Sequence, residues 1–196
     1  MKIIISLLLL SVVSAAPAFA DDKSFYAVVD AGSVFYTDAS LISGNFLLIG
    51  GGYHLNRYVG IEAGFTLFSE GKKKSNCLFC SVDTTYTMNS STSYAAAVVT
   101  LPFTEKFGVF GKLGQADTSL DYTITPTGSY PSRYSGQRTN TMFGVGWFLD
   151  IARGFSIRAQ YENFGKIPIA FVNMGSVVNM GSIAIDVLSV GGIYNF

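Results

Sequence analysis

Five charged residues stand inside segments that are otherwise apolar or rich in glycine, and they are the residues best placed to form a site. They are Asp30, Glu62, Lys112, Arg158 and Glu162. Because each one alternates with apolar neighbours, an extended strand would turn the charges to one face and the apolar side chains to the other. Unpaired charges in a closed interior carry a large desolvation cost, whereas acids beside bases neutralise one another. We therefore expect an interior ion-pair cluster, with Asp186 as a further candidate member.

Such a cluster could act as a structural plug, which we favour, or as the gate of a narrow pore. Catalysis finds little support in the same segments. The only histidine, His54, stands directly before a short connection at residues 55–58. The chain has no Gly-x-Ser-x-Gly motif to supply a nucleophile for which His54 could be the general base. We predict no catalytic residues.

The two cysteines, Cys77 and Cys80, have the spacing of a redox or metal-binding motif. A redox pair normally sits at the N-terminus of a helix, and no helix is predicted there. A structural zinc site would need two further Cys or His ligands, and only His54 remains. We therefore expect a small disulfide between Cys77 and Cys80, no metal and no cofactor.

The first 20 residues have the pattern of an export signal. Lys2 gives a positive start, residues 3–13 are almost entirely aliphatic, and Ala18-Phe19-Ala20 matches a cleavage site. The alternative, an N-terminal membrane anchor, would need a longer apolar run. Export suits the expected disulfide, and residues 21–196 then form one domain. Basic and acidic residues number 13 each, so the chain lacks the basic surface that nucleic acid requires.

Period-two alternation recurs eight times along the chain, while helical periodicity is nearly absent. The alternating segments are residues 25–35, 46–55, 59–67, 92–101, 107–114, 140–149, 155–162 and 183–196. Beyond the export signal, no stretch approaches the length of apolar sequence that a transmembrane helix needs. A chain that is hydrophobic on average but never continuously so is typical of strands that cross a membrane.

Short and long connections alternate strictly between these segments. Residues 55–58, 102–106 and 150–153 predict tight turns, whereas residues 36–45, 69–91, 115–138 and 165–182 predict long polar loops. In an up-and-down barrel this order puts every long loop at one end, as in outer-membrane barrels. His54 would then lie at the short-turn end, opposite the end where an enzyme acting on surface lipids needs its base.

Alternation alone does not identify the solvent, because a soluble barrel alternates too and turns its apolar face inward. Two features favour lipid outside. The face opposite the apolar one is rich in glycine, which suits a narrow, crowded lumen. The apolar face carries aromatic residues near the strand ends, as interfacial girdles require. These aromatic residues are Phe25, Tyr53, Trp147, Tyr161, Tyr194 and Phe196.

Several short stretches resemble known outer-membrane barrels. The terminal Phe196, preceded by apolar or aromatic residues at alternate positions, resembles their C-terminal signature. Leu101-Pro102 followed by Val-Phe-Gly-Lys-Leu-Gly at residues 109–114 resembles one hairpin of the OmpA-like barrel domain, and residues 53–64 are similar to another. The resemblance implies an internal salt-bridge cluster that includes Glu62 and Lys112. No C-terminal peptidoglycan-binding domain is recognised, so a wall-anchoring role is not implied.

We therefore predict an all-β, eight-stranded, antiparallel up-and-down transmembrane β-barrel, a monomer of the bacterial outer membrane with a structural or surface-interaction role. A passive channel for small or hydrophobic solutes is the alternative, and a lipid-modifying enzyme is a third possibility. The expected partners are outer-membrane lipid and lipopolysaccharide, with host or phage surface molecules as further candidates. Lys72, Lys73 and Lys74 could contact lipopolysaccharide phosphates or simply form a solvated loop.

Overall fold

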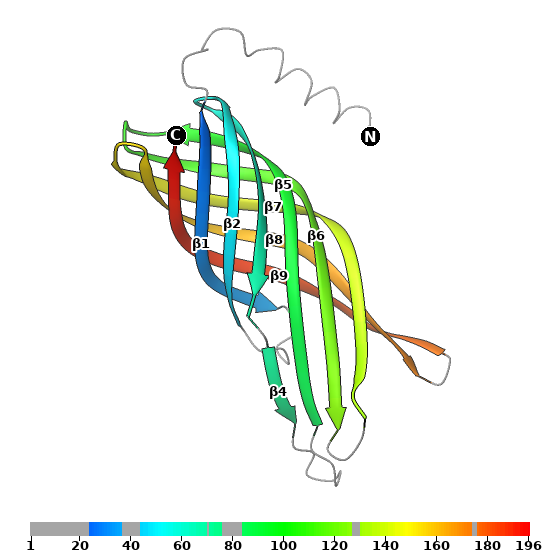
Figure 1. Cartoon of the computed structure of the whole chain (residues 1–196). Helices are drawn as coiled ribbons and strands as arrows, with labels where there is room; N and C mark the ends of the chain where they lie inside the picture. Colours follow the sequence, from blue (N-terminus) through cyan, green and yellow to red (C-terminus); the bar gives the residue numbers. More distant parts are fainter. Residues whose placement is uncertain (1–23, 37–43, 70, 76–83, 127–129, 174–175) are drawn as a thin grey trace, which may run out of the picture.

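The computed structural model describes residues 24–36, 44–69, 71–75, 84–126, 130–173 and 176–196. These residues form antiparallel strands that close into a barrel (Figure 1). None of them belongs to a helix of the length and apolarity needed to cross a membrane. The strands are β1 (Phe25–Tyr36), β2 (Gly44–Asn56), β3 (Val59–Phe68), β4 (Gly71–Ser75), β5 (Thr84–Pro102), β6 (Phe107–Pro126), β7 (Ser132–Ala152), β8 (Phe155–Asn173) and β9 (Ser176–Asn195).

Nine strands occupy eight positions around the barrel. Residues 59–67 of β3 pair with residues 91–99 of β5, and β4 pairs further along the same strand with residues 84–88. Strands β3 and β4 therefore follow one another in a single position. Closure comes from β1, which pairs with β9 on one side and with β2 on the other. The predicted eight-stranded antiparallel barrel is confirmed.

Tight turns join β2 to β3, β5 to β6 and β7 to β8, and local hydrogen bonds explain their geometry. The Asn56 side-chain oxygen accepts hydrogen bonds from the backbone N–H groups of Tyr58 and Val59, both at 2.8 Å. Such an Asx turn reverses the chain in a few residues. The third turn uses Gly154 at a φ of 77°, a backbone conformation that glycine adopts without strain. We call this end of the barrel the turn end, and the opposite end the far end.

Side chains alternate between lipid and lumen along every wall strand. Ile61 is 53% exposed on the outer face, while its neighbour Glu62 is 3% exposed on the inner face. Leu113 and Lys112 on β6 show the same contrast, at 60% and 3%. The predicted orientation, apolar residues outward and charged residues inward, is therefore confirmed for these strands.

The strands are much longer than the alternation predicts. Strands β5 to β9 run for 19 to 21 residues each. Most of residues 115–138 and 165–182, predicted as loops, are paired strand, and β4 with the start of β5 replaces much of the loop predicted at 69–91. These loop predictions were wrong because the outer face of the strands turns polar beyond the belt, although on β6 the inner-face residues Ala116 and Thr118 remain buried. The backbone ladder continues regardless of side-chain polarity.

Beyond the apolar belt the barrel wall divides at the far end. Pairing between β7 and β8 ends at Phe143 and Asn163, whereas β6 and β7 remain paired as far as Ile124 and Ser132. Strands β4 to β7 and the β8–β9 hairpin leave the barrel in different directions (Figure 1). We call the part of β4–β7 beyond the belt the projecting sheet; it comprises residues 71–75, 84–91, 115–126 and 132–142.

Candidate functional site

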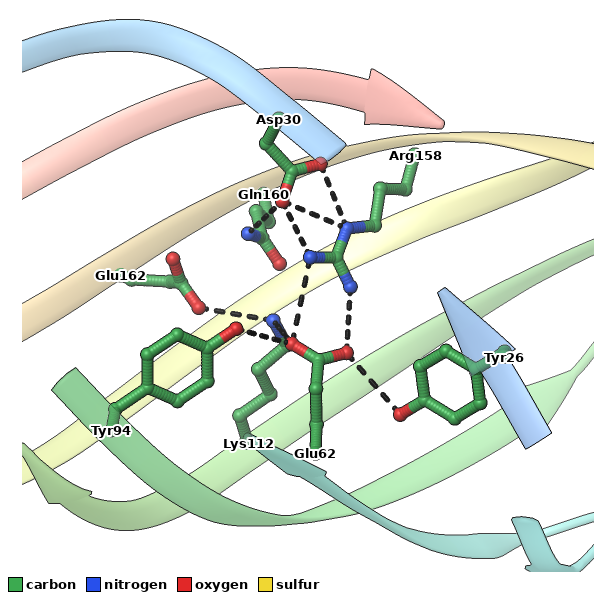
Figure 2. A network of polar contacts seen from close by, with 8 residues as sticks. All are labelled: Tyr26, Asp30, Glu62, Tyr94, Lys112, Arg158, Gln160 and Glu162. Atoms are coloured by element: carbon green, nitrogen blue, oxygen red, sulfur yellow. Dashed lines mark hydrogen bonds and ion pairs between the residues drawn. The ribbon is translucent and has the colours of Figure 1, made fainter. Parts of the chain in front are cut away.

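The structure brings the five expected charged residues together inside the barrel. Asp30 comes from β1, Glu62 from β3, Lys112 from β6, and Arg158 and Glu162 from β8. Each points inward because it alternates with residues that face lipid. The five side chains meet across the lumen (Figure 2). We call these residues the charge cluster.

Glu62 is the centre of the charge cluster. One of its carboxylate oxygens lies 2.7 Å from Lys112 Nζ, and the other lies 2.8 Å from Nη1 of Arg158. Two tyrosines also donate to it, Tyr94 from the neighbouring strand β5 at 2.7 Å and Tyr26 from β1 at 3.2 Å. Both carboxylate oxygens of this buried acid are therefore hydrogen bonded, as a buried charge requires.

Arg158 joins the other acid to the centre. Its Nε and Nη2 both donate to Asp30, which lies on β1 on the other side of β9. Two parallel N–H donors matched to one carboxylate form the bidentate arrangement that arginine makes best. The side-chain amide of Gln160 donates a further hydrogen bond to Asp30 at 3.2 Å. Each side chain of these ion pairs is at most 2% exposed.

Glycines on the inner face make room for the charge cluster. A Cβ at Gly191 would collide with a carboxylate oxygen of Asp30 and with the carbonyl of Val29. A Cβ at Gly64 would lie 2.7 Å from the ring of Tyr94. The glycine-lined lumen that the sequence predicts thus has a steric basis, because larger residues would displace the groups that bind Asp30 and Glu62.

The lumen differs above and below the charge cluster. Toward the far end, the rings of Tyr94, Phe164, Phe68 and Phe46 follow one another from β5 to β8, β3 and β2, with centroids 6.0 to 6.4 Å apart. Toward the turn end lies a cavity of about 620 Å³, bounded by Lys112 and Arg158. The described lumen is therefore closed by two successive barriers, one charged and one aromatic.

The sequence did not reveal three contributors to this lumen. Tyr26, Tyr94 and Gln160 bind the charged groups, and their signal was available, since each lies on the inner face of an alternating strand. The aromatic barrier was also missed. Phe46, Phe68 and Phe164 lie at the ends of the alternating segments or just beyond them, where polarity had stopped alternating.

Asp186 does not belong to the charge cluster, so this expectation is corrected. It lies on β9 and accepts hydrogen bonds from the Tyr161 hydroxyl at 2.5 Å and from the Asn163 amide at 2.6 Å. Asp186 lies two residues before Leu188 on β9, so the two side chains point to the same face of the strand. Leu188 is 54% exposed on the outer face, and Asp186 therefore lies on the lipid side of the wall rather than in the lumen.

The remaining candidate residues lie apart from the charge cluster. His54 ends up at the turn end, where its backbone N–H donates to Ser24 and its ring lies 4.5 Å from that of Tyr26. Lys72, Lys73 and Lys74 form part of strand β4, opposite residues 85–87, rather than a loop. Cys77 and Cys80, with the export signal at residues 1–20, lie outside the described residues.

A closed antiparallel barrel with an apolar outer belt and a charged lumen defines a transmembrane β-barrel. The family model for the outer membrane protein beta-barrel domain matches residues 5–196. The chain therefore belongs to this family of outer-membrane proteins. A comparison with curated protein sequences finds no match.

Solved structures of small outer-membrane proteins share the fold. AlkL, determined in lipid bilayers, has a TM-score of 0.57 at 10% identity, over 91% of this chain and 92% of AlkL. OprG from Pseudomonas aeruginosa has 0.55 at 13% identity, over 89% and 93%. Neisserial surface protein A has 0.52 at 18% identity, over 88% and 97%. At these identities the likeness concerns the fold alone.

Proposed function

We propose that the protein is a lipid-embedded platform that presents the projecting sheet at the cell surface, after export and removal of residues 1–20. The observation that carries this proposal is the division of the chain into a sealed barrel and a long polar extension. The barrel holds the protein in the membrane, and the extension offers a surface for interaction. In this proposal the protein acts as a monomer and not as a catalyst.

The projecting sheet reaches well outside the bilayer. On the outer face of β6, Leu113 is the last apolar residue, and Gln115, Ser119 and Asp121 beyond it are exposed. The 13 residues from 114 to 126 extend about 40 Å at the usual rise of a strand. A structural anchor alone would not need strands that continue so far into water, which favours a surface role.

One edge of the projecting sheet is suited to binding. Among the described strands, none pairs with the outer edge of β7 beyond Phe143, so backbone groups of residues 132–142 face outward. An exposed edge can accept an extended segment from a partner as an added strand. Gln137 donates to Asp117 on β6 at 2.6 Å, which ties this edge strand to its neighbour. Exposed Arg133 and Arg138 favour an acidic partner segment.

The partners proposed are host or phage surface molecules at this edge and lipopolysaccharide around the wall. Lys72, Lys73 and Lys74 lie on β4 within the projecting sheet, on the strand furthest from the β7 edge. Three lysines in succession would attract the phosphates of lipopolysaccharide.

Trimming the projecting sheet tests the surface role. Replacing residues 121–135 with Asn-Gly keeps Leu120 opposite Gly136 and ends the shortened hairpin in a favoured turn. Cells carrying the trimmed protein should lose adhesion to an epithelial cell layer, while the protein keeps its heat-dependent mobility shift on a detergent gel. Unchanged adhesion by the trimmed, folded protein would refute the role of this sheet.

A conductance measurement tests the alternative of a passive channel. Because the charged and aromatic barriers both cross the lumen, purified protein in a planar bilayer should give no steady single-channel steps. The variant Phe164→Ala should also remain closed, since the charge cluster is intact. Steady conductance by the unmodified protein would overturn the platform proposal in favour of a channel.

A further inference from the structure

The charge cluster contains more acid than base. Asp30, Glu62 and Glu162 oppose only Lys112 and Arg158, and all five side chains are at most 2% exposed. If all five were ionised, one negative charge would remain uncompensated among side chains that are almost completely buried. Proteins avoid this situation because an unpaired buried charge has a large desolvation cost.

The contacts of the three acids show which one carries the surplus. Asp30 receives two guanidinium nitrogens and an amide, and both oxygens of Glu62 are hydrogen bonded. Glu162 has one contact, between its Oε1 and Lys112 Nζ at 3.0 Å. Its Oε2 is buried and has no hydrogen-bond partner among the described residues. Lys112 lies closer to Glu62, at 2.7 Å, as expected if Glu62 is the more strongly charged acceptor.

A second buried oxygen near Glu162 also lacks a donor. Gln160 lies two residues before Glu162 on the same inner face of β8, and its amide nitrogen is already committed to Asp30. This commitment fixes the amide orientation and leaves Gln160 Oε1 without a partner in the described structure. Figure 2 shows both side chains on the same side of the cluster. Two buried acceptors on the same face of β8 therefore lack a donor, and a proton on Glu162 would remove the charge from one of them.

We propose that Glu162 is held in the lumen as the neutral acid, with its proton on Oε2, the carboxyl oxygen that contacts no base. Asp30 and Glu62 then balance Arg158 and Lys112 exactly, and no net charge is buried. The Oε1 atom of Glu162 still accepts from Lys112 as a carbonyl oxygen. The groups that surround Glu162 are Glu62 on β3, Tyr94 on β5 and Lys112 on β6 across the lumen, and Gln160 and Arg158 on its own strand β8.

Matched amide substitutions test the proposal by stability. Glu162→Gln replaces a neutral acid by a neutral amide of the same shape, so its urea unfolding midpoint in lipid vesicles should equal that of the parent. Asp30→Asn makes the same chemical change at an ionised acid and should lower the midpoint clearly. Equal losses in the two variants would overturn the proposal, because Glu162 would then be as charged as Asp30.

Infrared spectroscopy of the folded protein in vesicles gives an independent readout. At about pH 8, where exposed glutamates are ionised, the parent should show the carbonyl band of a protonated carboxylic acid. The band should be absent in Glu162→Gln, and it should weaken or vanish in Asp30→Asn, where Glu62 and Glu162 alone oppose the two bases. A spectrum without this band would refute the bound proton.

A cation could supply the same positive charge, and a salt exchange separates the two. If sodium chloride stabilises the parent more than choline chloride, and this difference vanishes in Glu162→Gln, the missing charge is an alkali cation and the proton proposal is wrong. Equal midpoints in the two salts are the expected result.

Discussion

Replacing Arg158 with methionine should destabilise the barrel strongly, because this residue is the only cation that contacts Asp30 among the described residues. The substitution removes the contacts to Asp30 and the 2.8 Å contact to Glu62. Methionine keeps much of the side-chain volume, so the loss is mainly electrostatic. Asp30 would keep only the amide of Gln160 as a side-chain partner. Breaking a buried ion pair by removing one partner costs about 3–5 kcal/mol.

Urea unfolding in lipid vesicles, followed by tryptophan fluorescence, measures this loss. With a slope of about 2 kcal/mol per M, a loss of about 4 kcal/mol lowers the unfolding midpoint by about 2 M. The matched control is Arg153→Met, which makes the same chemical change at an exposed arginine in the β7–β8 turn and should change the free energy of unfolding by less than about 0.5 kcal/mol.

A double variant tests whether charge balance is the cause. Asp30→Asn combined with Arg158→Met removes one charge of each sign, so the double variant should be more stable than Arg158→Met alone. The reasoning is refuted if Arg158→Met costs less than about 1 kcal/mol, or if the double variant loses the sum of the two single losses.

Two further predictions use other features of the wall. Gly191→Ala should cost about 1–3 kcal/mol because its Cβ would collide with Asp30, whereas Gly111→Ala, whose Cβ would find its nearest neighbour 4.0 Å away, should stay within about 0.5 kcal/mol in the same urea titration. Trp147, the only tryptophan and 42% exposed on the outer face, should be quenched by lipids with brominated acyl chains. Moving the indole inward with Trp147→Phe and Phe148→Trp should abolish that quenching, and equal quenching of both proteins would contradict the assigned orientation.

The sequence predicted the parts of the fold in which lipid and lumen impose opposite requirements on neighbouring residues. Residues 59–67 show why: Ile61 and Phe65 must contact acyl chains, while Glu62 between them must face inward. Together with the short turns, this alternation predicted that Glu62, Lys112 and Arg158 share the inner face at similar distances from the turn end, where they could meet. The tight turns were predictable because Asn56 and Gly154 supply their own local geometry.

Residues 115–138 were misassigned because the outer face turns polar where the bilayer ends, although on β6 the inner face, with Ala116 and Thr118 buried, still alternates with it. Outside the bilayer, Ser119 and Asp121 contact water, and their pairing with Gln137 and Ser135 depends on backbone hydrogen bonds that any residue can make. The expectation that Asp186 belongs to the charge cluster was wrong for a different reason. The sequence indicates roughly how far along its strand an acid lies. A shift of one residue, however, decides whether its side chain faces the lumen or the lipid.

The distribution of the charge cluster along the chain constrains how the barrel assembles. The β1–β2 and β3–β5 hairpins carry only the acids Asp30 and Glu62, the β6–β7 hairpin carries Lys112, and Arg158 follows on β8. Arg158 and Asp30 are 128 residues apart, so their encounter waits for the last strand to reach the first. Contacts of such long range slow folding. Before β9 pairs with β1, a partly formed sheet therefore carries charges of the cluster without all of their partners. These charges must stay hydrated on the inner surface until closure of the barrel excludes the water.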